Sequence, residues 1–129
     1  DLFHSTSNIE HTMVDDWISN LNLNFTLVVG NHDVYSRHNF KTVYELEIDN
    51  ILLTHEPVEN HQANIFGHLH PGFSLKGKGR QHLSFPSFYI NPQFIALPAF
   101  GRLNGRKNYK ELQKKSVVYL TTEEGLIKV

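Results

Sequence analysis

The chain has 129 residues, 40% of them hydrophobic, and a formal net charge of −1. This length allows one domain with a hydrophobic core and is too short for two ordinary domains. The absence of cysteine excludes disulfides and thiolate metal sites, so any metal must be held by His, Asn and carboxylate groups. No apolar run approaches the ~18 residues of a membrane helix, and no signal peptide opens the chain. We therefore expect a cytoplasmic protein without membrane contacts.

The first predicted element is an amphipathic helix. Ser7 and Glu10 have the spacing of a capping box, which predicts that the helix begins beside them. Apolar residues then recur every fourth position and predict one buried helical face, made of Ile9, Met13, Trp17 and Leu21. The polar residues expected on the outside are Asp15, Asp16 and Asn20.

Short apolar runs bounded by turn residues predict strands over most of the remaining chain. The predicted strands are residues 25–29, 44–48, 51–53, 63–66, 73–75, 83–90, 94–97, 117–121 and 126–129. Asp49-Asn50 and Glu123-Glu124-Gly125 are turn signals, and each predicts a hairpin between its flanking strands. Pro86 predicts an edge strand or a bulge within its run. A helix followed by strands that dominate the C-terminal half predicts a mixed α/β layered domain.

Charge is distributed unevenly along the chain. Residues 1–75 carry ten acidic and two basic residues, a net charge of −8, whereas residues 76–115 carry nine basic residues and one acidic residue, a net charge of +8. The basic segment either forms a face for a polyanion such as nucleic acid or is a solvated loop surface. The sequence leaves both interpretations open.

Polar residues that suit metal ions follow several of the predicted strands. These residues are Asp1, Asn31, His55, His68 and His70. Layered α/β folds assemble sites from loops at strand ends, so distant segments are expected to converge there. This mixed nitrogen and oxygen set suits Mn²⁺, Fe or Zn²⁺. Two such ions roughly 3.5–4 Å apart activate a shared water and clamp a phosphate ester, which predicts hydrolysis without a covalent enzyme intermediate.

The order of these motifs resembles that of the calcineurin-like metallophosphoesterases. The matching stretches are Gly30-Asn31-His32-Asp33, the lone His55 and Gly67-His68-Leu69-His70, and Asp1 is similar to the Asp of the family's second motif. The stretches most similar to the bacterial DNA-ligase-associated branch are residues 1–5, 53–57 and 97–101. The resemblance implies one α/β metallophosphoesterase domain over residues 1–129, a layered sandwich of two β-sheets flanked by helices.

The resemblance also implies a two-metal site. We expect Mn²⁺, with Fe and Zn²⁺ as alternatives. The implied ligands are Asp1, which would bridge both ions, then Asn31, His55 and His68 for the second ion, and His70 for the first. His32 would not be a ligand, but would protonate the leaving oxygen or stabilise charge on the phosphoryl group.

One family motif has no counterpart in this sequence. Family members carry an Asp-x-His motif upstream of the position of Asp1, so we expect this chain to lack the first strand and helix of the fold. His4 and His11 do not replace that motif, because His4 follows Asp1 in a predicted loop and His11 lies on the predicted helix. The first metal would then keep only Asp1 and His70 as ligands, and would bind weakly or be completed by solvent.

Two functional hypotheses follow. The first is an enzyme, a metal-dependent phosphoesterase that hydrolyses phosphate mono- or diesters through a metal-activated water, with nucleic acid as a candidate substrate. For this enzyme the resemblance implies DNA-ligase-associated repair proteins as partners. The alternative is a catalytically impaired fragment that acts only as a metal- or polyanion-binding module, because half of its first metal site is missing. The sequence leaves the oligomeric state open.

The aromatic residues have a simpler interpretation. Those that could form a base-stacking platform are Trp17, Phe85, Phe88, Phe94 and Phe100. Aromatic side chains are so often buried that we expect these five in the core instead. Arg80 and Arg102 lie near glycines, but surface ion pairs explain them equally well, so we assign them no site role.

Overall fold

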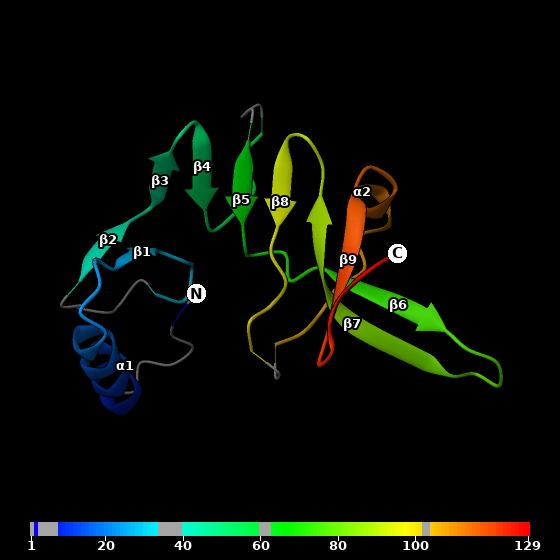
Figure 1. Ribbon diagram of the computed structural model, residues 1–129, viewed down its shortest axis with the longest axis horizontal. Coiled ribbons are helices and arrows are strands. Elements are labelled where there is room, and N and C mark those ends of the chain that lie inside the picture. The colour runs from blue at the N-terminus through cyan, green and yellow to red at the C-terminus, as the bar shows by residue number, and fades with distance from the viewer. Residues whose placement is uncertain (1, 3–7, 34–39, 60–62, 102–103) are drawn as a thin grey trace.

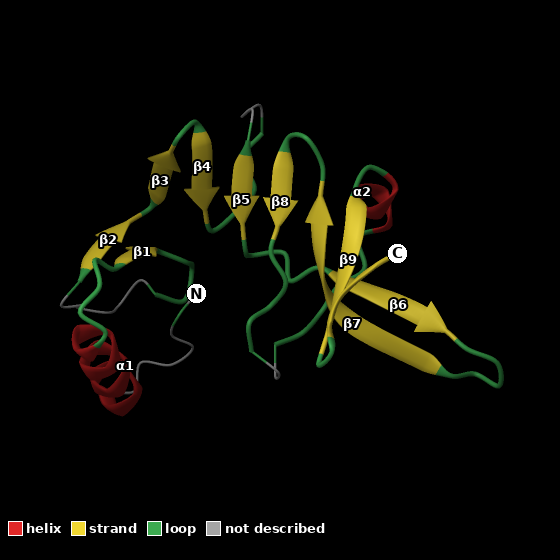
Figure 2. Cartoon of the chain, viewed as in Figure 1, coloured by secondary structure: helices red, strands yellow, loops and turns green. Residues whose placement is uncertain are grey.

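The structure is a computed structural model that describes residues 2, 8–33, 40–59, 63–101 and 104–129 (Figure 1). Two helices are found in these ranges, α1 (Asn8–Asn20) and α2 (Lys110–Lys114). The strands are β1 (Thr26–Val28), β2 (Lys41–Val43), β3 (Glu45–Ile48), β4 (Ile51–Thr54), β5 (Asn64–Phe66), β6 (Gly72–Lys76), β7 (His82–Ile90), β8 (Phe94–Ala96), β9 (Val117–Thr122) and β10 (Gly125–Lys128). The predicted mixed α/β class is confirmed, with sheets dominating the fold (Figure 2). The sandwich arrangement stays a prediction.

The larger sheet brings the central strands into parallel register. Its strand order is β10-β9-β7-β8-β5-β4-β3, and β6 pairs with β7 outside this path. β4, β5 and β8 run parallel to one another, so their C-terminal ends meet at the same edge of the sheet. That edge lies at the bottom of β4, β5 and β8 in Figure 1.

The hydrophobic core lies at the junction of β5, β7, β8 and β9. Its buried members are Phe66, Tyr89, Ala96, Val118 and Leu120. Phe85 and Phe94 pack against this cluster, which confirms their prediction as core residues. Tyr89 is fully buried, and its hydroxyl group donates a hydrogen bond to the carbonyl of Gly72 and accepts one from Gln113 Nε2 at 2.7 Å.

The turn chemistry predicted from the sequence is confirmed in both hairpins. β3 and β4 pair antiparallel across Asp49 and Asn50, which adopt φ angles of 50° and 66°, a left-handed conformation that Asn and Asp tolerate. β9 and β10 pair antiparallel across a turn that ends at Gly125, with a φ angle of 127°. Pro86 marks an edge as predicted, because β7 pairs there with β6 alone and its pairing with β9 begins at Ser87.

The smaller sheet pairs β1 and β2 in parallel. β2 was not predicted, because Lys41 and Thr42 are exposed and Val43 is only half-buried, so a three-residue strand leaves no apolar alternation to detect. Helix α1 and the two strands of this sheet lie together at one end of the molecule (Figure 1). Neither α1 nor α2 is long and apolar enough to cross a membrane, within the ranges given above.

The predicted buried face of α1 is wrong. Met13 and Trp17 expose 68% and 59% of their surface, whereas Ile18 exposes only 5%. Ile18 lines a hollow together with Phe25 and Phe40, so the helix turns this side toward the small sheet. Helical periodicity identified an apolar stripe but not which side meets the sheet. Ser7 and the side chains of Ile9 and Glu10 lie outside the described residues.

Phe100 was also predicted in the core, and this is wrong. Its side chain is fully exposed, at 106% of the reference surface. Phe100 follows Pro98 in the loop after β8, where the chain has already left the sheet. An apolar residue beyond a strand end has no neighbouring strand to cover it.

Replacing Tyr89 with phenylalanine should lower the free energy of unfolding by about 1–2 kcal/mol, because the buried bonds to Gly72 and Gln113 are lost. Burial raises the pKa of the Tyr89 hydroxyl. An unfolded tyrosine titrates near pH 10. Above pH 10 the free energy of unfolding of the wild type should therefore fall, and its difference from that of Tyr89→Phe should become smaller. Urea unfolding at pH 8 and pH 10.5 measures both effects. Tyr44→Phe, at an 80% exposed position, should change nothing, and an unchanged Tyr89→Phe protein would contradict this account.

Candidate metal centre

Two histidines reach the same edge of the large sheet because their strands are parallel. His55 directly follows β4, and His68 lies two residues beyond the end of β5. The backbone N–H groups of Gly67 and His68 both donate to the carbonyl oxygen of His55, at 3.2 and 2.9 Å. The two loops are therefore joined at the histidines themselves.

The third contribution comes from the turn after β1. The N–H of Asp33 donates to the Gly30 carbonyl at 3.2 Å, and the N–H of Gly30 donates to Asp33 Oδ2 at 2.8 Å. Asp33 is buried, and its second carboxylate oxygen accepts a bond from Leu2 N–H at 2.9 Å. These bonds close the turn on both sides and leave Asn31 and His32 exposed at its tip.

Three side-chain atoms that could bind a metal lie close together where these loops meet. His55 Nε2 lies 2.8 Å from Asn31 Oδ1 and 2.8 Å from His68 Nδ1. The two imidazole rings are 4.8 Å apart and nearly perpendicular, at 78°. Asn31, His55 and His68 are the three residues that the family resemblance assigns to the second metal, and the fold brings all three together from different loops.

The donor set fits a divalent cation better than it fits hydrogen bonding alone. Asn31 Oδ1 is an acceptor, so a hydrogen bond to it requires a proton on His55 Nε2. That single proton would then also have to serve His68 Nδ1. A cation bound at about 2.0–2.2 Å would satisfy one lone pair from each residue. Adjacent ligand atoms at such distances are separated by about 3 Å, close to the spacing observed here.

Electrostatics keep the central imidazole in its neutral form. Burial, with a smaller contribution from His68, lowers the pKa of His55 to about 4, although the nearby carboxylates of Glu56 and Asp33 oppose the shift. At neutral pH His55 is therefore uncharged, with one of its two ring nitrogens unprotonated. Neutral imidazole is the form that binds metals.

The remaining predicted site residues are His70, His32 and Asp1. His70 adopts a φ angle of 46°, and its carbonyl accepts a bond from Lys107 N–H at 3.1 Å. Within the described part of the chain, no group of three His, Asp or Glu side chains is close enough to hold a metal, so His70 does not complete a trio with His55 and His68. His32 lies beside Asn31 at the exposed turn tip. Asp1 lies outside the described residues.

A buried asparagine, Asn64, is hydrogen-bonded to residues on both sides of His55. Asn64 exposes only 2% of its surface. Its amide nitrogen donates to the Leu52 carbonyl and to Thr54 Oγ1, both at 2.9 Å, and its oxygen accepts from Val58 N–H at 3.0 Å. The Thr54 hydroxyl in turn donates to the Glu56 carbonyl at 2.6 Å. These bonds hold the chain on both sides of His55.

Sequence reasoning missed the supporting roles of Asp33 and Asn64. Asp33 belongs to a recognised motif, and the frequency of Asp in turns was a signal for its role. Asn64 lies between Ala63 and the apolar residues Ile65 and Phe66, and no motif marks it. Its partners, Leu52, Thr54 and Val58, lie 6 to 12 residues earlier in the chain, and only the folded structure shows that Asn64 contacts all three.

Comparison with known proteins yields a structural match. No protein-family model matches the chain, and no curated protein matches it. Among solved structures, the crystal structure of the Pseudomonas putida nuclease MPE is similar, with a TM-score of 0.78 and 28% sequence identity. The match covers 95% of this chain and 63% of that chain, so the present chain spans less than two thirds of the nuclease. The similarity indicates a nuclease- or phosphoesterase-like fold.

Replacing Asn64 with alanine should lower the free energy of unfolding by about 2–3 kcal/mol, because one buried and two partly buried hydrogen-bonding groups lose their partner. Denaturant unfolding followed by circular dichroism measures the change. The matched control is Asn91→Ala, since Asn91 Oδ1 also accepts two backbone bonds, from Gln93 and Phe94, but at a more accessible turn. Equal losses in the two variants would contradict the special role of Asn64.

Proposed function

We propose that this chain carries a metal-dependent phosphoesterase activity that hydrolyses phosphate mono- or diesters, with nucleic acid as the substrate class. The observation that carries the proposal is the convergence of Asn31, His55 and His68 within 2.8 Å contacts. The structural similarity to a nuclease supports the reaction class. The order of motifs along the sequence supports it independently.

The residues of the chain would divide the work as follows. Asn31 supplies an amide oxygen, and His55 and His68 supply neutral ring nitrogens, to a divalent ion, for which we propose Mn²⁺. Such ions, when bound, lower the pKa of a coordinated water and neutralise charge on the phosphate. Asp1 and His70 remain proposed ligands of a second ion on the strength of the resemblance.

His32 is the proposed catalytic residue. It is exposed and lies next to Asn31 at the tip of the turn closed by Asp33. From this position its imidazole could donate a proton to the leaving oxygen or stabilise charge on the phosphoryl group. The two hydrogen bonds between Asp33 and Gly30 fix the turn, so His32 needs little reorganisation before the reaction.

A second candidate function is metal or polyanion binding without turnover. One observation favours it: within the described residues His70 does not join His55 and His68 in a three-ligand group. A site with fewer ligands binds its metal more weakly. Measured turnover distinguishes this candidate from the proposed enzyme.

Hydrolysis of bis(p-nitrophenyl) phosphate should require added Mn²⁺ and should stop when EDTA is present in excess. His32→Ala should lower kcat by about 100-fold or more, the usual contribution of a general acid. The matched control is His82→Ala, because His82 is exposed on β7 and should leave kcat unchanged.

Turnover that persists in EDTA, or equal turnover by the wild type and His32→Ala, would contradict the proposed mechanism. A folded wild-type protein that binds Mn²⁺ without any turnover would support the binding module instead. Circular dichroism establishes that each sample is folded.

A further inference from the structure

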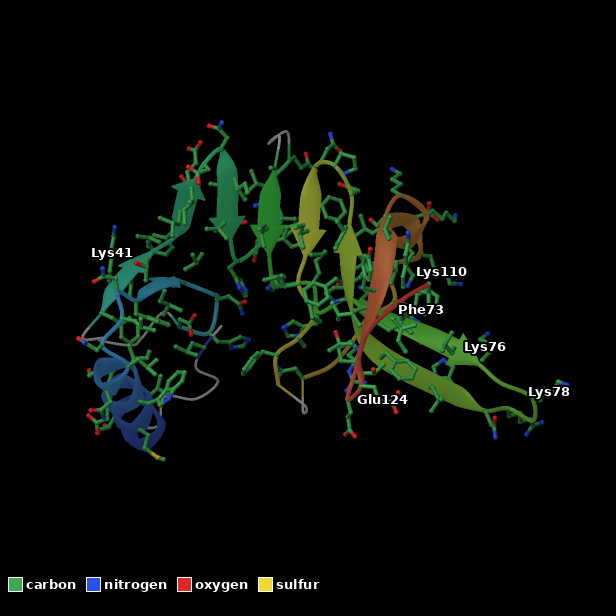
Figure 3. The ribbon with its side chains drawn as sticks, in the orientation of Figure 1. Lys41, Phe73, Lys76, Lys78, Lys110 and Glu124 are labelled. Carbon is green, nitrogen blue, oxygen red and sulfur yellow. The ribbon has the colours of Figure 1, made fainter. Side chains whose placement is uncertain are left out.

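The hairpin of β6 and β7 projects from the body of the protein. In Figure 3 Lys76 and Lys78 lie along and at the end of this hairpin, far from Lys41 at the opposite end of the molecule. The paired residues run from Gly72 opposite Pro86 to Lys76 opposite His82. A turn closed by a 3.0 Å bond from Gly77 N–H to the Gln81 carbonyl connects the strands.

The register gives this hairpin two chemically different faces. Cross-strand partners share a face, and faces alternate along each strand. One face is apolar and carries the pairs Phe73–Phe85 and Leu75–Leu83. The opposite face is polar or small and carries the pairs Gly72–Pro86, Ser74–Ser84 and Lys76–His82. Phe73 and Phe85 pack against the core, so the apolar face is anchored at its base.

Residues 106–108 lie against the polar face. Asn108 Nδ2 donates to Ser74 Oγ at 2.6 Å, and an Arg106 guanidinium nitrogen donates to the Ser84 carbonyl at 2.9 Å. A Cβ atom at Gly72 would lie only 2.9 Å from Arg106 Cβ, so glycine permits this close approach. Arg106 is thereby held on the same face as Lys76 and His82, with four further N–H donors on its guanidinium.

The polar face begins at the chain segment that contains His70. Lys107 N–H donates to the His70 carbonyl at 3.1 Å, and the Lys107 carbonyl accepts from Gly72 N–H at 3.0 Å. His70 is two residues from His68 in the sequence. A path of basic side chains therefore leads outward from this motif, through Arg106 and Lys76, to the hairpin tip with Lys78 and Arg80.

The charge on this path is of one sign. Residues 60–110 contain seven Lys or Arg and no Asp or Glu. Lys76, Lys78 and Arg80 are all exposed. Lys107 is used differently, because its ammonium group lies 5.1 Å from the centre of the Tyr109 ring. Lys76 on the polar face, and Lys78 and Arg80 in the turn beyond it, are thus exposed cations with no Asp or Glu within residues 60–110.

We propose that the polar face of the β6–β7 hairpin, with Arg106, binds the sugar–phosphate backbone of a nucleic acid and leads it to the candidate metal centre. This inference rests on the proposed function and names the contacts that would hold its substrate. At about 3.3 Å per residue, Gly72 to Lys76 spans about 13 Å, which equals about four base-pair steps of 3.4 Å measured along the axis of a duplex. The face carries no Phe, Tyr or Trp for stacking bases, so binding is to phosphates and independent of sequence.

The test compares two charge-matched triple variants. The first, Lys76→Gln/Lys78→Gln/Arg80→Gln, removes three cations from the hairpin. The control, Lys41→Gln/Lys115→Gln/Lys128→Gln, removes three exposed lysines elsewhere. Fluorescence anisotropy in EDTA, between 50 and 200 mM NaCl, measures the binding of a labelled 20-nucleotide single strand and of the matching duplex. EDTA prevents metal-dependent cleavage during the measurement.

The hairpin variant should bind at least about tenfold more weakly at 50 mM NaCl, and the slope of log affinity against log salt should fall by about 2–3, because each lost phosphate contact accounts for about 0.7–0.9. The control should retain wild-type binding. A larger loss on the duplex would identify paired DNA as the substrate form, and a larger loss on the single strand would identify the unpaired form. The proposal would be overturned if both triple variants bound nucleic acid as tightly as the wild type, or if both lost binding to the same extent.

Hydrolysis of bis(p-nitrophenyl) phosphate separates this proposal from the proposed function. This small diester does not reach the hairpin, so both triple variants should hydrolyse it at the wild-type rate. Selective loss of nucleic-acid binding in the hairpin variant, without hydrolysis by any protein, would uphold the basic face and reject the enzyme. Hydrolysis of the small diester by all three proteins, together with equal nucleic-acid binding by all three, would uphold the enzyme and reject the basic face.

Discussion

The junction between the loops after β4 and β5 determines the geometry of the candidate site. One carbonyl oxygen, that of His55, accepts hydrogen bonds from the N–H groups of both Gly67 and His68. The parallel pairing of the two strands sets their ends side by side, and this double acceptor then fixes the separation of the imidazoles. Asn64 holds the same loop from behind through its bonds to Leu52, Thr54 and Val58. Backbone hydrogen bonds and one buried side-chain amide thus position the site residues without any bound ligand.

Much of the fold could be predicted from the sequence because its strands are short apolar runs separated by strong turn residues. Asp49 and Asn50 adopt left-handed conformations that few other residues tolerate, so their signal was specific. The strand β2 could not be predicted, since its exposed residues 41 and 42 carry no pattern and its partner β1 is distant in sequence. Which side of a helix or loop is buried depends on tertiary packing and cannot be read from local sequence. For this reason the predicted burial of Trp17 and Phe100 was wrong.

The candidate site shows the same division between local and tertiary information. The order of the motifs predicted Asn31, His55 and His68 as parts of one site, and the fold places their donor atoms in contact. Asn64 could not be found in this way, because two of its partners lie on β4, which only the folded sheet places beside β5, and the third, Val58, lies in the loop between these strands. The basic segment was ambiguous in sequence. The register of β6 and β7 gives their hairpin an apolar face and a polar face, and polyanion binding on the polar face stays a proposal.

The central claim is that Asn31, His55 and His68 together hold a divalent ion. The most direct measurement is a crystal structure of the protein grown with Mn²⁺, with anomalous diffraction collected at the manganese edge. The account predicts an anomalous peak about 2.0–2.3 Å from Asn31 Oδ1, His55 Nε2 and His68 Nδ1. A well-ordered structure at saturating Mn²⁺ in which these atoms bind each other directly, with no peak among them, would contradict it.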